Sequence, residues 1–427
     1  MKRVLIICYY WPPAGGPGVQ RWLKFVKYLP QYGIEPVVFV PQNPSYPIVD
    51  DSLAKEVADD LEIIRCPINE PYKLAKLIGG KKSTDISKGV IPKEAPSLVE
   101  KALLAVRGNF FIPDARVGWV KPAVKMAGNY LRQHPVEAVI TTGPPHSLHQ
   151  IGVKLQQQFQ IPWIADFRDP WTTIHYHKEL RLGKRAQGLH RRMEAEVLQG
   201  ADHILVTSPG TKAEFETKTQ KPVTMITNGF DGRPKSSKAG HDHFSLTHIG
   251  SLLTDRNPTP VWEALSELLE QEHSFKQAFK LHLAGVVGKE VYESLAVYGL
   301  TPFLKDHGYL SHQDALQLQT SSGLLLLLEM NKEETRAIIP GKLFEYMSSG
   351  RPILALGPEG SDVAPILEES GSGSFFCWED KEAIKLYLLN AFRDYKAGML
   401  QGGKSDRLIK YSREHLSGRL AELLHEL

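Results

Sequence analysis

A short segment in the C-terminal half of the chain carries residues suited to holding a diphosphate. Pro340 and Gly341 open a predicted helix, so free backbone N–H groups stand at its start, where the helix dipole attracts an anion. Lys342 adds a positive charge, and Leu343 follows it in the same binding segment. Glu345 lies within the first two turns, where its carboxylate can accept hydrogen bonds from ribose hydroxyls. The alternative is that Glu345 only complements the helix dipole.

A second glycine-rich turn lies near the N-terminus, where Gly15 and Gly16 follow an apolar run. Glycine lets backbone approach a ligand closely, and the following helix start attracts anions. A nicotinamide dinucleotide site would usually place an acidic residue after the second strand. The second strand here ends in Val40–Asn43 without one, which argues against a dehydrogenase.

These turns need strands and helices to position them, and the hydrophobic pattern supplies both. Val4–Cys8 is an apolar run, residues 19–29 have helical periodicity, and Val37–Val40 is a further apolar run. Strand, glycine-rich loop, helix and strand form a βαβ unit, which implies a parallel sheet. Ligands of such sheets bind beyond the carboxyl ends of the strands.

A second series of the same kind begins after the polar residues 231–243. We predict its strands from the following segments: Leu246–Ile249, Lys280–Ala284, Gly308–Leu310, Gly323–Leu328 and Ile353–Leu356. The length of 427 residues also favours two domains. The fold class expected is α/β, with two Rossmann-like domains whose parallel sheets face each other across a cleft.

The domain boundaries follow from this pattern. An N-terminal, acceptor-side domain covers residues 1–230, a linker 231–243, and a nucleotide-sugar-binding domain 244–410. Residues 411–427 form a C-terminal helix that could pack back on the first domain.

The segment Pro340–Leu356 resembles the donor-binding signature of family 4 retaining glycosyltransferases, which have the GT-B fold. Tyr9–Gly16 and Ala165–Trp171 resemble a bacterial polysaccharide-synthesis branch of that family. The resemblance covers most of the chain and is weakest between about residues 43 and 138. It implies transfer of a sugar from a nucleotide-diphosphate sugar with retained configuration, without a covalent enzyme intermediate and without a metal.

The resemblance also implies roles in the second domain. Glu345 is similar to the second glutamate of the family motif, while the position of the first is occupied by Ala337. Arg256, after Gly250, would hold the donor diphosphate, since a guanidinium fork suits phosphate oxygens. Two further residues of the same donor site are Gly285, as a close-packing glycine, and Gly308, in the loop that receives the nucleobase.

In the first domain the resemblance places Gly15 and Gly16 near the donor β-phosphate and the acceptor. Arg168 occupies the position where many members have a histidine, and Asp169 follows it. His146, at a neighbouring strand end, completes the candidate catalytic set. The alternatives are an ion-pair cluster of purely structural role around Asp166, Arg168 and Asp169, and a loop-packing His146.

Charge and composition limit the classes of binding partner that the sequence suggests. The net charge of +3 is too balanced to suggest nucleic acid. The segment 71–107 has eight Lys or Arg and three Asp or Glu, which gives 8 − 3 = +5. With the apolar residues up to 112, it could contact an anionic membrane peripherally. Flotation with liposomes that contain or lack anionic lipid tests this expectation.

Other classes of site find little support in the sequence. The histidine pairs His175/His177 and His241/His243 lack a matching carboxylate–histidine set, so we expect no metal and no cofactor besides the nucleotide-sugar substrate. Three isolated cysteines suit a reducing compartment, and no apolar run is long enough to span a membrane. We expect a cytoplasmic protein, with the inner membrane face as a peripheral location.

The sequence therefore predicts a hexosyltransferase-like enzyme acting on a glycan or lipid-linked acceptor in cell-surface polysaccharide synthesis. Two alternatives stay open: a non-catalytic nucleotide-sugar-binding protein and a sugar-nucleotide epimerase on the same scaffold. The fold alone does not choose among them.

Overall fold

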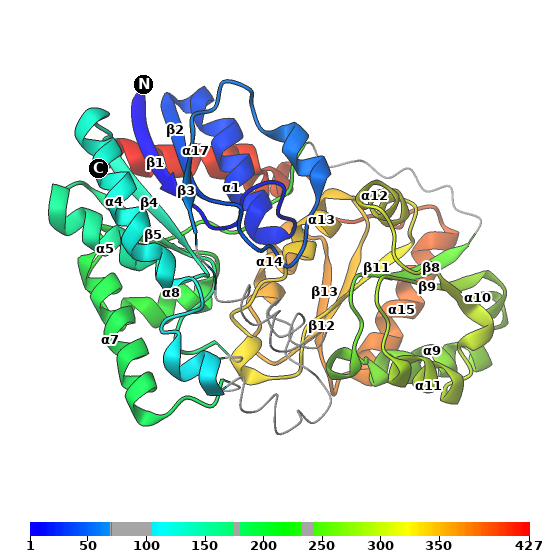
Figure 1. Ribbon diagram of the computed structural model, residues 1–427. Helices are drawn as coiled ribbons and strands as arrows, with labels where there is room; N and C mark the ends of the chain where they lie inside the picture. Colours follow the sequence, from blue (N-terminus) through cyan, green and yellow to red (C-terminus); the bar gives the residue numbers. More distant parts are fainter. Residues whose placement is uncertain (69, 71–104, 175–176, 178–179, 233–242) are drawn as a thin grey trace. The chain divides into compact units, whose positions relative to one another are not determined.

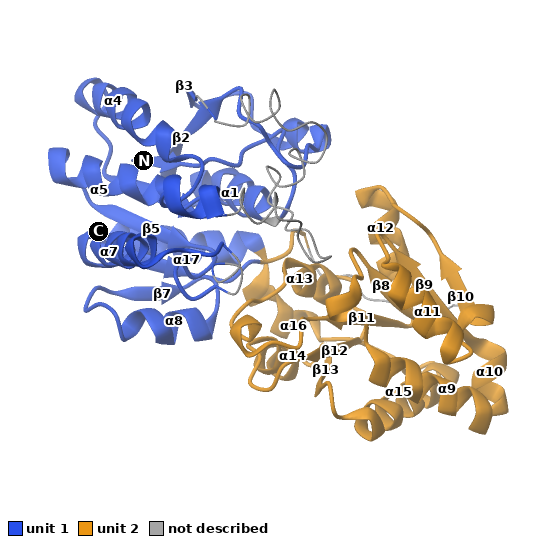
Figure 2. Ribbon diagram, turned by 60° about the horizontal axis from the view of Figure 1, so that its bottom comes forward, with its two compact units in different colours: residues 1–228, 413–427 blue, residues 229–412 orange. Residues whose placement is uncertain are grey.

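Short apolar runs that end in glycine, proline or polar residues form the strands of two parallel sheets in the computed structural model (Figure 1). The structure describes residues 1–68, 70, 105–174, 177, 180–232 and 243–427. Two units are distinguished, one of residues 1–228 and 413–427 and one of residues 229–412 (Figure 2). Each has its own apolar core, so each is described by itself.

Within its described residues, unit 1 contains a seven-stranded sheet in the order β3-β2-β1-β4-β5-β6-β7, with every neighbouring pair parallel. The strands are β1 (Lys2–Ile7), β2 (Ile34–Gln42), β3 (Ile63–Pro67), β4 (Ala138–Gly143), β5 (Trp163–Phe167), β6 (His203–Val206) and β7 (Val223–Met225). The helices are α1 (Pro17–Tyr28), α4 (Val117–Gln133), α5 (Ser147–Phe159), α7 (Lys184–Gly200), α8 (Pro209–Glu216) and α17 (Arg413–Glu426), with 3₁₀ turns at Leu29–Tyr32 and Asp51–Glu56.

The described residues of unit 2 form a six-stranded parallel sheet in the order β10-β9-β8-β11-β12-β13. The strands are β8 (Phe244–Ile249), β9 (Phe279–Ala284), β10 (Leu304–Asp306), β11 (Leu324–Leu328), β12 (Ile353–Gly357) and β13 (Gly373–Cys377). The α-helices are α9 (Thr259–Gln271), α10 (His273–Ala278), α11 (Lys289–Val297), α12 (His312–Thr320), α13 (Gly341–Ser348), α14 (Val363–Ser370), α15 (Lys381–Lys396) and α16 (Ser405–Leu408). Single 3₁₀ turns span Thr254–Arg256, Thr301–Phe303, Glu333–Thr335 and Ile409–Tyr411.

Both sheets reverse their strand order at one point, between β1 and β4 in unit 1 and between β8 and β11 in unit 2. At such a switch point the connections leave in opposite directions, and the carboxyl ends of the two strands frame a crevice that binds ligands. The loops after β8 and β11 carry Gly250 and Glu329, so the topology brings these residues to one place.

The strand pattern differs from the sequence expectation at the edges of the two sheets, where β3 and β13 were not among the predicted strands and β10 lies at another position than predicted. Gly308–Leu310, expected as a strand, lies in the loop after β10, and the strand itself is the more polar Leu304–Asp306. A short edge strand has one face and one edge in solvent, so it needs no apolar run and gives no periodic signal.

The C-terminal helix α17, red in Figure 1, belongs to unit 1 and packs beside α1. Leu416, Leu420 and Leu424 are buried in the same core cluster as Trp22 and Phe25 of α1. Their spacing of four residues places them on one helix face. The chain therefore leaves unit 1 near residue 228 and returns to it at Arg413, close to the boundaries of 230 and 411 expected from the sequence.

Two segments singled out in the sequence lie largely outside the described residues. They are residues 71–104 of the basic segment and residues 233–242 of the linker. None of the helices among the described residues is long and apolar enough to cross a membrane.

Candidate functional site

Three glycines predicted from the sequence meet at the carboxyl ends of β8, β9 and β10. The N–H of Gly250 donates to Ala284 O at 2.6 Å, and the N–H of Gly285 donates to Gly308 O at 2.6 Å. Their φ angles are 120°, 117° and 59°, which disfavour other residues. A Cβ added to Gly285 would lie 2.5 Å from Gly250 O. Glycine is therefore required for these loops to stack so closely.

Lys342, the second residue of α13, extends over the first of these glycines. A Cβ added to Gly250 would lie 1.9 Å from Lys342 Nζ, so only the bare glycine leaves room for the ammonium group. Burial, followed by the positive charge of Arg256, lowers the pKa of Lys342 to about 8, while Glu345 opposes the shift. An anion bound beside this ammonium group would stabilise its charged form.

Arg256 ends the 3₁₀ turn after β8 and is half-buried. Burial lowers its pKa, and the carboxylates of Glu329 and Asp255 act in the opposite direction. Among the described residues, neither Arg256 nor Lys342 has a side-chain hydrogen bond or ion pair. His248, on the adjacent strand end, has its pKa lowered to about 3 by burial and then by the charge of Lys342. It therefore stays neutral, and the positive charge of this cluster belongs to Arg256 and Lys342.

Helix α13 begins at Gly341, as the sequence predicted, with Pro340 at the preceding position. Its first N–H groups have no partner within the helix and stand beside Lys342. Glu345 is half-buried one turn later, and its carboxylate has no hydrogen bond or ion pair with a described residue. Leu343 does not face this site. Its side chain is fully buried in the cluster that contains Leu325 and Leu327, because an apolar residue at this helical position meets the sheet.

Glu329 was not among the residues predicted from the sequence. It directly follows the five leucines of β11 and is 4% exposed. Burial raises its pKa to about 8, against the Ser361 hydroxyl and the positive charge of Arg256. A charged residue at the end of a fully apolar run is the signal that could have identified it. Ala337, in the following loop, is half-buried, while Glu333 and Glu334 are exposed.

In unit 1 the loop after β1 and the residues after β5 come together at the start of α1. A Cβ on Gly18 would lie 1.6 Å from Arg168 Nη1, so the guanidinium rests directly on this glycine. Arg168 also donates to Gly143 O at 3.3 Å and to Pro144 O. The N–H of Gly15 donates a hydrogen bond to Ile48 O. Gly16 has a φ of 104°, and a Cβ added to it would meet only open space.

Asp166 has a structural role. Its carboxylate is fully buried, pairs with Arg21 at 2.9 Å, and accepts hydrogen bonds from Trp22 Nε1 and Thr142 Oγ1, both at 2.8 Å. All its neighbours come from unit 1, so it joins β5, β4 and α1. Asp169 is different, because no described residue hydrogen-bonds its carboxylate and burial raises its pKa.

His146 is more buried than expected for a catalytic base in a strand-end loop. Its ring is 8% exposed and stacks on Trp171, with ring centroids 4.8 Å apart and an interplanar angle of 5°. Neither ring nitrogen has a hydrogen-bond partner in the described part of the chain. Burial lowers its pKa well below the usual value, with the neighbouring His149 as the next cause. The imidazole is therefore neutral and weakly basic in this packing.

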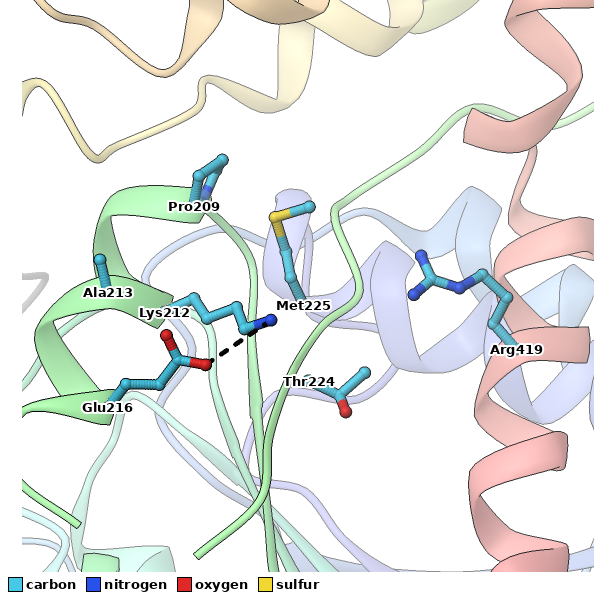
Figure 3. A pocket seen from close by; sticks show the side chains of 7 residues that line it. All are labelled: Pro209, Lys212, Ala213, Glu216, Thr224, Met225 and Arg419. Carbon is cyan, nitrogen blue, oxygen red and sulfur yellow. Dashed lines mark ion pairs between the residues drawn. The ribbon is translucent and has the colours of Figure 1, made fainter. Parts of the chain in front are cut away.

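A separate pocket of about 470 Å³ lies in unit 1 between α8, β7 and α17 (Figure 3). Lys212 and Arg419 line it, but Lys212 points toward Glu216, with which it forms an ion pair of 3.6 Å. None of the predicted site residues lines this pocket. The described residues also contain no group of three or more His, Cys, Asp or Glu side chains arranged to hold a metal ion.

Solved structures share this two-sheet architecture. Sucrose-phosphate synthase from Thermosynechococcus elongatus has a TM-score of 0.62 at 14% identity, over 100% of this chain and 99% of that one. HepE from Anabaena, solved in complex with UDP, has a TM-score of 0.62 at 12% identity, over 100% of both chains. WaaG, a glycosyltransferase involved in lipopolysaccharide biosynthesis, has a TM-score of 0.55 at 14% identity, over 99% of both.

No curated protein sequence matches the chain. The family model described as a glycosyl transferase 4-like domain matches residues 15–229, which include the Gly15–Gly18 loop, His146 and Asp166–Asp169. The two Rossmann-like units and the family match confirm the predicted fold and class. The chain belongs to the glycosyl transferase 4-like family and is a glycosyltransferase with the GT-B fold.

Proposed function

We propose that the enzyme transfers a sugar from a nucleoside-diphosphate sugar with retention of configuration, and that the donor binds at the β8–β11 switch point of unit 2. The observation that carries the proposal is a pair of cations without a hydrogen bond or ion pair to a described residue: Lys342, which lies over Gly250, and Arg256, which is close enough to lower the pKa of Lys342. Two half-buried positive charges that form no ion pair with a described side chain are stabilised by an anionic ligand, and a diphosphate supplies one.

The neighbouring groups fit the rest of a nucleotide. Glu345 lies one turn into α13, close enough to Lys342 to affect its pKa. A ribose attached to the diphosphate would present its hydroxyls to this carboxylate. The Gly285 and Gly308 loops adjoin Gly250, and a Cβ added to Gly308 would meet only open space, so a nucleobase could approach this backbone closely. HepE, which has the same fold, is known in complex with UDP, which makes UDP a reasonable first ligand.

The chemistry follows from where charge develops. The bond between the anomeric carbon and the β-phosphate oxygen breaks, and its electron pair leaves with the nucleoside diphosphate. The acceptor hydroxyl oxygen bonds to the same face of the anomeric carbon, and its proton passes to the departing phosphate oxygen. Arg256, Lys342 and the N-terminus of α13 stabilise that growing negative charge. We propose that these groups take the place of a metal ion.

Unit 1 would receive the acceptor. Gly16 offers exposed backbone at the start of α1, with Arg168 resting on Gly18 beside it. Asp169, whose carboxylate has no described hydrogen-bond partner, is the candidate to contact an acceptor hydroxyl. His146 would then shape the site through its stack on Trp171 without transferring a proton. We propose a glycan or lipid-linked acceptor of cell-surface polysaccharide synthesis, and membrane contact through residues 71–112 remains a sequence-based expectation.

Calorimetric titration with UDP, GDP, ADP, CMP and dTDP, each with and without a sugar, tests the donor site. Arg256→Ala should weaken binding of the preferred nucleotide about 10- to 100-fold, since a hydrogen bond to a charged group contributes about 1.5–3 kcal/mol. Glu345→Ala should weaken the binding of ribonucleotides more than the binding of the corresponding deoxyribonucleotides. Arg393→Ala, an exposed arginine of α15, is the matched control and should change nothing.

Two results would contradict this function. Equal binding by wild type and Arg256→Ala would remove the diphosphate assignment. Binding of a nucleotide sugar without any hydrolysis or transfer, over a broad set of acceptors, would favour the non-catalytic binding protein. Formation of an epimeric nucleotide sugar instead would favour the epimerase.

A further inference from the structure

Glu329 differs from every other buried carboxylate in the described residues. Four acidic side chains are buried there: Glu70, Asp166, Glu194 and Glu329. The first three are satisfied by hydrogen bonds or ion pairs, for example Asp166 with Arg21 and Glu194 with Lys218. Glu329 Oε2 accepts a hydrogen bond of 2.6 Å from Ser361 Oγ, but Glu329 Oε1 has no partner. An orphaned buried carboxyl oxygen is costly unless a ligand satisfies it.

The surrounding fold makes room for this carboxyl group. The backbone N–H of Glu329 continues the sheet by donating to Leu356 O at 2.9 Å. Its side chain crosses the end of β12, where a Cβ on Gly357 would lie 2.3 Å from Oε2. Ser361, in the loop before α14, fixes the other side. Glycine and serine thus hold one oxygen and leave the second one free at the carboxyl end of β11, beside the β8 loop.

The charges of the site are linked by electrostatic interactions. Lys342 interacts with Arg256 and Glu345, and Arg256 interacts with Glu329 and with the exposed Asp255. Apart from Asp255, these interactions link Glu345, Lys342, Arg256 and Glu329 in that order. A nucleoside-diphosphate sugar has the same order of groups, with ribose, two phosphates and then the sugar. If Glu345 receives the ribose and the two cations receive the phosphates, Glu329 is at the sugar end.

The protonation of Glu329 suits a hydroxyl ligand. With a pKa of about 8, the group is mainly a neutral carboxylic acid at pH 7. A neutral carboxyl does not repel the adjacent diphosphate, and it can donate one hydrogen bond and accept another. A sugar hydroxyl likewise donates and accepts, so one hydroxyl satisfies the unpartnered side of the group.

We propose that Glu329 binds a hydroxyl of the donor sugar through its unpartnered oxygen and so contributes to the choice of sugar. The proposal rests on the proposed donor function. The competing explanation is that Glu329 only orients Arg256, in which case it would affect every ligand that carries a diphosphate.

The test compares each nucleoside diphosphate with its sugar, using UDP with UDP-glucose, GDP with GDP-mannose and ADP with ADP-glucose. Glu329→Ala should weaken binding of the accepted nucleotide sugar about tenfold, the loss expected for one buried hydrogen bond. The affinity for the diphosphate alone should change less than about twofold. Glu329→Gln, which keeps a donor and an acceptor in the same volume, should retain most of the affinity. Glu359→Ala, exposed on the same β12–α14 loop, is the control.

Analogues of the accepted nucleotide sugar that each lack one sugar hydroxyl identify the hydroxyl that Glu329 contacts. The analogue that lacks the contacted hydroxyl should bind about tenfold more weakly to wild type and be insensitive to Glu329→Ala. An equal loss for diphosphate and nucleotide sugar, or no loss for either, would overturn the proposal while leaving the donor site intact. If wild type bound none of the nucleotides, the proposed function itself would fail, and the assignment of Glu329 would fail with it.

Discussion

At the residue scale, the proposed donor site contains two cations, Arg256 and Lys342, that form no hydrogen bond or ion pair with a described side chain. Arg256 is close enough to Lys342 to lower the pKa of that ammonium group. In the absence of ligand this arrangement is unfavourable, because burial opposes both charges. The diphosphate that we propose as ligand would convert the same arrangement into a stabilising one. The two positive charges of the unliganded site would therefore favour anionic ligands over neutral ones.

Lys342 should make nucleotide binding depend on pH. Its pKa in the free protein, about 8, lies below the ordinary value of 10.5 because of burial, and a bound diphosphate will raise it. UDP affinity should be flat from pH 7 to about 8 and fall above that, since the second phosphate pKa of about 6 lies well below this range. Titration in buffers of different ionisation enthalpy at pH 8 should detect proton uptake.

Substitution separates the groups responsible for this pH dependence. Lys342→Met should weaken UDP binding and reduce the change of UDP affinity with pH. The ionisation of Glu329 near pH 8 should account for the pH dependence that remains. Adding Glu329→Gln should remove this remaining dependence. Lys289→Met, on the exposed side of α11, should keep the wild-type profile. A wild-type affinity that stays constant up to pH 9.5 would show that Lys342 is not in contact with the phosphates.

At the element scale, parallel strands end in loops that must stack without side chains between them. Gly250, Gly285 and Gly308 join β8, β9 and β10 through short backbone hydrogen bonds, and Gly250 also accommodates Lys342. The position of the Lys342 side chain thus depends on how these glycine loops pack at the carboxyl ends of the strands. In unit 1, Arg168 on Gly18 is a comparable arrangement at the start of α1.

Gly285→Ala should damage the donor site through backbone displacement. The added methyl group would lie 2.5 Å from Gly250 O, at a φ of 117°, so the Gly250 loop has to move. We expect UDP affinity to fall at least about tenfold and the protein to lose about 1–3 kcal/mol of stability from overpacking. Gly360→Ala has a positive φ of 74° but open space around it. This control should cost about 1–2 kcal/mol and leave UDP binding unchanged.

At the scale of the whole molecule, the last helix of the chain completes the first unit. Helix α17 follows all of unit 2 in the sequence but contributes buried leucines to the core formed by α1 and β1. Its end is also tied to the first residues, because Lys2 Nζ donates to Leu424 O at 3.1 Å. The stability of unit 1 thus depends on residues at both ends of the chain.

Leu420→Ala should destabilise unit 1 and spare the donor site. Removing a fully buried leucine costs about 2–5 kcal/mol, which corresponds to about 5–15 °C in Tm for a unit of this size. In differential scanning calorimetry the transition assigned to unit 1 should move down, while the transition that UDP shifts upward should stay in place. Glu422→Ala, on the exposed face of α17, should leave both transitions unchanged. A shift of the UDP-sensitive transition by Leu420→Ala would contradict this assignment.

Local chemistry in the sequence determined the two α/β series, the loops at strand ends and the start of α13. Alternating apolar runs and glycine breaks specify these features over a few residues, and the φ angles near 120° at Gly250 and Gly285 require glycine. The same reasoning selected Lys342 and Glu345 as candidates, because a cation and a carboxylate at a helix start suit a diphosphate and a ribose, although a carboxylate there can also only complement the helix dipole.

Only the tertiary structure decided which charged residues are satisfied. Asp166 meets Arg21, 145 positions away, and becomes part of the core, while His146 is covered by Trp171. Glu329 depends on Gly357 and Ser361 for its space and its single hydrogen bond. Burial and partners of this kind arise from contacts between distant segments, and no local pattern encodes them. The position of Glu329 directly after five leucines is a local signal, but only the fold shows that the residue is buried and that one of its oxygens has no described partner.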